Sequence, residues 1–365
     1  MNFLFKDKWI KWLLFFAVIN LLICLFARWP IIPSGDSISY FEATKFLRGE
    51  EVEKSFDFAT IYNRLLTAPL FIFLTSLFSF IFGIYGSMFF INIIFYLAAT
   101  VSFYLLANEV LQNKKAAFLS SFFIFLNYDI INFGIAHLTD MAGWAFFIAA
   151  SFLAVKYFNR QEKKDFWLAV IISSIGVLFK EYGGLGMISL VFLIGFSLKG
   201  KKEKIKEMSV AILTFLSVLA AYHLFFYFYF GYSYLDWYGF NLNYYLANPA
   251  SRKNSYDFIL LVKVLGWLFL AGWPIFAFGL IKIIKEKWNK EGIVFLALLP
   301  ASLFFLAWPV MTQRIAFVLV PWLALVSGFG LAKIKSDFTL IFFVFFYALS
   351  SYLTGYLMGI VNVPI

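Results

Sequence analysis

The sequence contains few charged residues and almost no cysteine or histidine. Asp, Glu, Lys and Arg make up 14% of its 365 residues, well below the roughly 25% typical of soluble domains. A single cysteine, Cys24, excludes an intramolecular disulfide and a metal site built from several cysteines. The two histidines, His137 and His223, lack the paired spacing typical of zinc ligands. These scarcities exclude an ordinary soluble domain and a cysteine-based framework.

Apolar residues are abundant instead. Hydrophobic residues make up 63% of the chain, aromatic residues 22%, and the mean hydropathy is +0.85. Runs long enough for the roughly 30 Å hydrocarbon core of a bilayer recur along the sequence. They occur at about 9–27, 65–84, 87–107, 115–131, 139–157, 166–179, 184–198, 209–230, 258–283, 293–308, 314–331 and 338–359. We predict an all-α, polytopic transmembrane bundle in which residues 1–365 form a single transmembrane domain, with no separate soluble domain.

The distribution of positive charge predicts the topology. Lysines and arginines gather in the connections near residues 114–115, 156–164, 199–206, 282–290 and 333–335. Positively charged loops lie on the cytoplasmic side, and all five do so only if the apolar helix at about 65–84 does not cross. This gives about eleven spans in the plasma membrane, with the N-terminus cytoplasmic and the C-terminus outside. The net charge of +10 is then a topology signal, and a nucleic-acid partner is not expected.

Two segments are long enough to form sizeable structures on the outer face. Residues 28–86 form the first outer loop, with juxtamembrane helices, and residues 231–257 form a loop rich in Tyr, Trp and Asn. Tyr40, Ala43 and Leu47 recur at helical spacing. We therefore expect a short juxtamembrane helix that begins near Asp36 and ends at Gly49. The chemistry of the protein is expected at this outer boundary or inside the bundle.

Two acidic residues on this face have two interpretations each. Asp36 and Asp140 both precede helical segments, so each acts either as an N-cap or as part of a site that the topology assembles on one face. His137 adds a third potential ligand for zinc, although its isolated position favours a site without metal.

Three basic residues stand at the outer ends of apolar runs. Charges near membrane depth are usually paired, snorkelling or functional. Lys180 either forms a local pair with Glu181 or binds an anionic head group. Arg314 and Arg64 either snorkel or offer a planar fork suited to phosphate oxygens.

Taken in order, these motifs resemble the GT-C superfamily of integral-membrane glycosyltransferases, in particular the protein O-mannosyltransferase and aminoarabinose-transferase branch. The resemblance rests on Asp36 followed by Tyr40, Ala43 and Gly49, on Ala68-Pro69-Leu70, on Asp140, on Lys180 with a following aromatic and Gly, and on Arg314 with Pro321. It implies a polyprenyl-phosphate-linked sugar donor and a juxtamembrane helix at the Pro-Leu stretch. Asp36 is followed by Ser37 rather than a second acid, which leaves a glycan, lipid or protein acceptor open.

The function that the resemblance implies is transfer of a sugar from this donor to an acceptor hydroxyl on the extracytoplasmic face, with inversion. Asp36 is expected to be the base and Asp140 its catalytic partner. Lys180 and Arg314, with Arg64, are expected to hold the donor phosphate. Further substrate contacts are expected from Tyr40, Glu181, His137, Asp236, Trp237 and Tyr238. No cofactor is expected, and a divalent metal is the alternative. Besides the donor and the acceptor, the expected partners are membrane lipids.

Two other classes of function remain. A transporter or flippase for a lipid-linked sugar would use the same charged residues to line a path, and would place polar groups at the midplane between repeated halves. A non-catalytic scaffold of a cell-envelope complex has no positive feature in this sequence. Loss of sugar transfer when the Asp36 carboxylate is removed would distinguish an enzyme from a transporter and from a scaffold.

Overall fold

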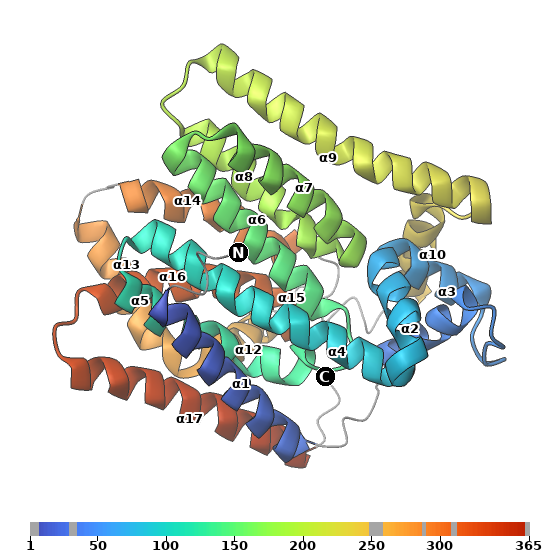
Figure 1. Cartoon of the computed structure of the whole chain (residues 1–365), viewed down its shortest axis with the longest axis horizontal. Helices are drawn as coiled ribbons and strands as arrows, with labels where there is room; N and C mark the ends of the chain where they lie inside the picture. Colours follow the sequence, from blue (N-terminus) through green and yellow to red (C-terminus); the bar gives the residue numbers. More distant parts are fainter. Residues whose placement is uncertain (1–6, 29–34, 248–257, 287–289, 308–311, 362–365) are drawn as a thin grey trace.

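The computed structural model describes residues 7–28, 35–247, 258–286, 290–307 and 312–361, and every regular element in these ranges is a helix (Figure 1). The all-α prediction is therefore confirmed. The longer helices are α1 (Lys8–Arg28), α2 (Gly35–Leu47), α3 (Phe58–Thr67), α4 (Pro69–Leu111), α5 (Lys114–Phe125), α6 (Asp140–Arg160), α7 (Lys163–Phe179), α8 (Gly186–Phe196), α9 (Lys201–Phe230), α10 (Tyr234–Ala247), α12 (Phe258–Phe269), α13 (Trp273–Lys285), α14 (Lys290–Ser302), α16 (Val320–Ala332) and α17 (Asp337–Val361). Short elements are η2 (Ile130–Gly134), η3 (Glu181–Leu185), η4 (Leu270–Gly272), η5 (Phe304–Ala307), α15 (Gln313–Ala316) and η6 (Phe317–Leu319).

The apolar helices identify an integral membrane protein. Within the described ranges, seven helical stretches are long and apolar enough to cross a membrane, and two shorter apolar stretches lie at 181–196 and 291–307. Several predicted runs are interrupted: 258–283 becomes α12, η4 and α13, while 314–331 becomes α15, η6 and α16. The number of eleven crossings stays a prediction.

Helix α4 joins two runs that the sequence separates. It extends over 43 residues from Pro69, and Gly83 in its interior has non-helical angles (φ 68°, ψ 170°). Proline suits the first turn of a helix because its missing N–H has no partner there, and glycine accepts a positive φ without steric cost. A straight helix of this length would measure about 65 Å, more than twice the hydrocarbon core. The kink therefore divides α4 into a segment near α2 and α3 and a segment inside the bundle.

The basic loops meet at one end of the bundle. Lys114 pairs with Asp7 at 2.8 Å, Lys333 with Glu286 at 2.8 Å, and Lys115 with Asp337. Helices α2, α3 and α10 lie at the opposite end (Figure 1). This separation agrees with the positive-inside argument, because the loops that must share a side are neighbours in space.

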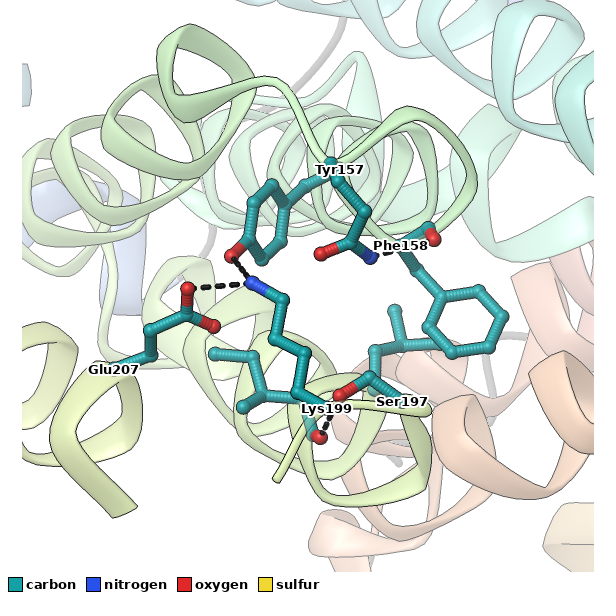
Figure 2. A pocket seen from close by; sticks show the side chains of 8 residues that line it. Tyr157, Phe158, Ser197, Lys199 and Glu207 are labelled. Atoms are coloured by element: carbon teal, nitrogen blue, oxygen red, sulfur yellow. Dashed lines mark hydrogen bonds and ion pairs between the residues drawn. The ribbon is translucent and has the colours of Figure 1, made fainter. Parts of the chain in front are cut away.

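A shallow hollow lies at the same basic end, between α6, α8 and α9. Figure 2 shows Lys199 in its wall, where the ammonium group donates to the Tyr157 hydroxyl at 2.6 Å and to the Glu207 carboxylate at 2.5 Å. The lysine is thus already neutralised by its neighbours, so the hollow is a structural feature of the helix ends.

We expect cysteine labelling to confirm the two sides. Ser55 and Ser336 are both exposed, and Ser336 lies in the basic connection before α17. In a Cys24→Ser background, a membrane-impermeant maleimide added outside intact cells should label Ser55→Cys, because the segment around it carries no basic cluster. Ser336→Cys should react only after permeabilisation. The reverse pattern would invert the topology.

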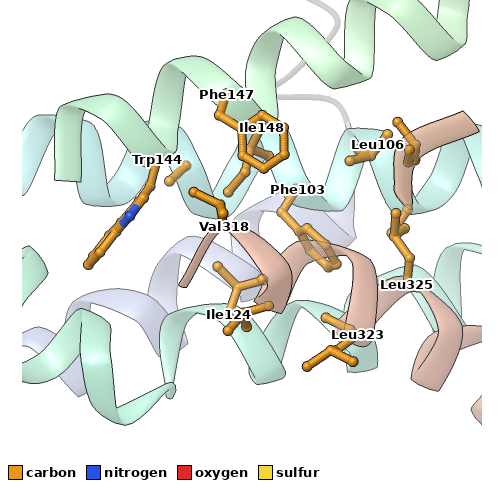
Figure 3. Close-up of a cluster of buried hydrophobic side chains, with 14 of the residues drawn as sticks. Phe103, Leu106, Ile124, Trp144, Phe147, Ile148, Val318, Leu323 and Leu325 are labelled. Carbon is orange, nitrogen blue, oxygen red and sulfur yellow. The ribbon is translucent and has the colours of Figure 1, made fainter. Parts of the chain in front are cut away.

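Aromatic and branched side chains fill the centre of the bundle. Figure 3 shows Phe103 of α4, Ile124 of α5, Trp144 of α6 and Leu323 of α16 in one cluster of buried side chains, and each is at most 1% exposed. Lipid tails are as apolar as these residues, so close packing rather than water exclusion holds the helices together. This core fixes the start of α6, and the start of α6 carries Asp140.

Candidate active site

Asp36 is bound by two arginines from distant parts of the chain. It lies in the first turn of α2 and its side chain is 36% exposed. Arg64 donates to Oδ1 at 2.6 Å and Arg314 donates to Oδ2 at 2.9 Å. Both carboxylate oxygens are therefore occupied by guanidinium groups.

Helix α3 holds Arg64 in place against α2. The Arg64 Nε donates to the Ser39 hydroxyl at 2.7 Å, and that hydroxyl donates to the backbone carbonyl of Asp36 at 2.7 Å. The guanidinium also lies 4.8 Å from the centre of the Tyr40 ring, a cation–π arrangement. Asp57 starts α3 by accepting from the backbone N–H of Thr60 at 2.8 Å. These contacts orient Arg64 toward Asp36.

Arg314 lies between the two acidic residues. It belongs to the short helix α15, whose N-cap Thr312 accepts from the Ile315 backbone at 3.4 Å. Its Nε is 3.7 Å from Asp140 Oδ1. Asp140, in the first turn of α6 and 1% exposed, also accepts a hydrogen bond from the Tyr182 hydroxyl. The guanidinium therefore bridges carboxylates that are about a hundred residues apart in sequence.

Lys180 completes the cluster from the junction of α7 and η3. Its ammonium group is 3.5 Å from Glu181 Oε2 and donates to the Tyr40 hydroxyl at 3.5 Å. Tyr40 is 2% exposed and also accepts from the Thr139 hydroxyl at 3.1 Å. The predicted substrate contact Tyr40 is therefore packed between the cations, where it positions Arg64 and Lys180.

The cluster is balanced in charge. Arg64, Lys180 and Arg314 face Asp36, Asp140 and Glu181. Burial alone would raise the pKa of Asp36, but Arg64, Arg314 and Lys180 hold it well below its usual range. Burial would lower the pKa of Lys180, yet the carboxylate of Glu181 and the neighbouring Tyr40 and Asp140 raise it. Asp36 and Lys180 are therefore both charged at neutral pH.

His137 lies apart from the ion pairs. Its ring is 5.8 Å from that of Phe41 and 5.7 Å from that of Tyr85, and its Nδ1 has no hydrogen-bond partner among the described residues. Burial lowers the pKa of His137, so the imidazole is neutral. No group of three His, Cys, Asp or Glu side chains that could hold a metal is assembled within the described ranges. The zinc alternative therefore finds no matching ligand set there.

The predicted aromatic loop contains helix α10, and the remainder of that segment, 248–257, is outside the described residues. Asp236 is exposed and accepts from the backbone N–H and the hydroxyl of Ser233 at 2.7 and 2.6 Å. Trp237 packs edge-on against Tyr234 at 5.3 Å, and Tyr238 is 61% exposed. Trp237 also packs against an apolar cluster that includes Tyr40 and Phe179, and the substrate contacts predicted for Asp236, Trp237 and Tyr238 stay predictions.

Sequence reasoning missed three side chains that orient the cluster. Ser39, Thr139 and Tyr182 contact Arg64, Tyr40 and Asp140, respectively. Serine, threonine and tyrosine are common throughout this sequence, so their type gave no signal. Their position next to Tyr40, Asp140 and Lys180 was the only available indication.

A family model matches the central part of the chain. Residues 67–225 match the family described as dolichyl-phosphate-mannose-protein mannosyltransferase. The match includes Asp140 and Lys180 and lies between Arg64 and Arg314 in the sequence. Over 172 residues, 45% of its length, the chain is 32% identical to an uncharacterized protein of Aquifex aeolicus (strain VF5), of which it covers 34%.

Solved structures extend the likeness to nearly the whole chain. ArnT from Cupriavidus metallidurans, solved with undecaprenyl phosphate, superposes with a TM-score of 0.65 at 11% identity, covering 90% of this chain and 61% of ArnT. The oligosaccharyltransferase AglB from Archaeoglobus fulgidus, solved with an inhibitory peptide and a dolichol-phosphate, gives 0.60 at 16% identity, covering 95% and 55%. Both are GT-C membrane glycosyltransferases. The chain therefore spans little more than half of these structures and has their fold.

Proposed function

We propose that this chain, which has the fold of GT-C membrane glycosyltransferases, transfers one sugar from a polyprenyl-phosphate donor to an acceptor hydroxyl on the extracytoplasmic face. The observation that carries the proposal is the Asp36 carboxylate held between Arg64 and Arg314, with Asp140 and Lys180 in the same cluster. A base and several phosphate-binding cations are the groups that this reaction needs.

Each member of the cluster has a part in the reaction. Asp36 accepts the proton of the acceptor hydroxyl, which then attacks the anomeric carbon from the side opposite the phosphate and inverts it. Arg64, Arg314 and Lys180 stabilise the charge that develops on the leaving phosphate. Asp140, held by Tyr182, keeps Arg314 in position. Neutral acceptors such as glycans, lipids or protein hydroxyls all fit this scheme.

The position of the cluster argues against a transporter. Asp140 begins α6 and Lys180 follows α7, whereas the far ends of these two antiparallel helices lie in the basic loop near Arg160. The charged groups are therefore gathered at one end of the helices, and a transport path would place them at the midplane.

The test is incubation of the purified chain with a panel of polyprenyl-phosphate sugars, followed by mass spectrometry for released polyprenyl phosphate. An enzyme of this class should release it from at least one donor. A matched control is Arg314→Ala, which removes a phosphate-binding cation on the same fold. Equal release by both proteins, or release from no donor, would contradict the proposal.

We expect the reaction to continue in the presence of EDTA. A catalytic metal would be expected between Asp36 and Asp140, and the Arg314 guanidinium lies there, 2.9 Å from one carboxylate and 3.7 Å from the other. The cation that neutralises both acids is thus part of the chain. Initial rates measured with and without the chelator should agree. Loss of activity that added Mn²⁺ or Zn²⁺ restores would show a metal requirement.

A further inference from the structure

The two arginines assigned to the donor phosphate already hold an anion. The Asp36 carboxylate accepts from Arg64 at 2.6 Å and from Arg314 at 2.9 Å. Arg64 directs Nε and Nη2 to Ser39 and Asp36, and Arg314 directs Nη2 to Asp36, with its Nε near Asp140. Both oxygens of Asp36 are occupied. Without a donor, the proposed base is therefore ion-paired with the two arginines that are proposed to bind the donor phosphate.

We propose that the donor phosphate and Asp36 exchange partners: the bound phosphate takes the guanidinium groups of Arg64 and Arg314, and the released carboxylate becomes able to accept the acceptor proton. This inference rests on the proposed function, because it assigns a regulatory step to the same site. It makes the base competent only when the donor is present.

The charge balance of the cluster favours such an exchange. Three cations face three carboxylates, so no cation is left over for an incoming phosphate. A phosphate can be neutralised only if a carboxylate gives up its partner. Asp36 is the acid suited to do so, because it is 36% exposed, whereas the side chains of Asp140 and Glu181 are 2% and 15% exposed. Once released, Asp36 can be solvated or can bind the acceptor hydroxyl.

The transfer step then balances. The acceptor oxygen forms a bond to the anomeric carbon while the bond between that carbon and the phosphate oxygen breaks, and the electron pair leaves with the phosphate. The acceptor proton passes to Asp36 and later to solvent. The phosphate gains one negative charge on leaving, and Arg64, Arg314 and Lys180 stabilise that charge. Departure of the polyprenyl phosphate returns both arginines to Asp36.

The test is the affinity of the purified full chain for undecaprenyl phosphate. Asp36→Asn keeps the size of the side chain and removes the competing charge, so it should tighten binding about tenfold, in line with the worth of a charge-assisted hydrogen bond. Two variants control for the general gain of positive charge. Asp140→Asn removes an acid that is only 3.7 Å from Arg314, and Glu181→Gln removes one beside Lys180. Both should tighten binding clearly less.

A double-mutant cycle locates the gain. Arg64→Ala should weaken binding more in the Asp36→Asn background than in the original chain, because only there is Arg64 free for phosphate before binding. If Asp36→Asn unfolds in detergent, Asp36→Ala removes the same competitor and should give the same gain. Equal tightening by all three neutralising variants, or additive effects in the cycle, would overturn the exchange while the original chain still binds the lipid. Absence of binding by every variant and by the original chain would overturn the proposed function itself.

Discussion

Asp36→Asn is expected to lower the rate of sugar transfer by about 10²–10⁴-fold, the usual worth of a positioned general base. The amide has nearly the same size, but only its oxygen accepts a hydrogen bond, so it keeps one of the two arginine contacts and cannot take the acceptor proton. The measurement is the initial rate of polyprenyl-phosphate release by mass spectrometry. Because binding of undecaprenyl phosphate should persist, the loss should appear in turnover rather than in saturation by the donor.

Asp57→Asn is the matched control for this variant. It makes the same chemical change in the same outer segment, at an exposed N-cap of α3 where asparagine caps as well as aspartate. Its transfer rate should stay within a small factor of the original. If Asp36→Asn transfers sugar at the original rate, Asp36 has only a structural role as an acidic residue in the first turn of α2.

Arg314→Ala and Lys180→Ala should each slow transfer by at least about tenfold, because a charge-assisted hydrogen bond to the leaving phosphate contributes roughly 1.5–3 kcal/mol. Their combined effect should be smaller than the product of the single effects, since two cations on one phosphate act as a unit. Arg314→Lys should recover little, because an ammonium group has no planar fork to contact Asp36 and Asp140 together. Rates and thermal unfolding midpoints should be measured on the same preparations.

A purely structural role for these cations makes the opposite prediction. Arg314 and Lys180 have the carboxylates of Asp140 and Glu181 as partners. Removing either cation would leave an uncompensated charge on its partner. In that case the variants would unfold at lower temperature, and the fraction that remains folded would transfer sugar at the original rate. Strictly additive losses of rate would also argue against a shared phosphate.

Five of the six charged residues of the candidate site were predictable as a group because charge is scarce and costly in this chain. Asp36, Arg64, Asp140, Lys180 and Arg314 each interrupt or border an apolar run, and topology placed them on one face. The structure brings all five into one cluster. Their pairing could not be predicted, since the sequence gives no distance between segments as far apart as α2 and α15.

Other predictions rest on residue types that are common at membrane boundaries. Aromatic rings such as those of Trp237 and Tyr238 are frequent at the interface, and this property does not indicate which ring contacts a substrate. The ring of His137 lies near those of Phe41 and Tyr85, and its substrate contact stays a prediction. In the fold, the apolar runs 65–84 and 87–107 are predicted as separate segments, and the non-helical angles at Gly83 divide α4 near that boundary.

The two arginine partners of Asp36 are synthesised at very different times during translation. Arg64 follows Asp36 by 28 residues, whereas Arg314 follows it by 278. A ribosome therefore delivers the first partner almost at once and the second only when the last helices are being inserted. Until Arg314 is synthesised, Arg64 is the only one of the two arginines available to Asp36. The site is completed only when α15 takes its place, so a chain shortened before residue 314 would retain the first ion pair and lack the bridge between the two acids.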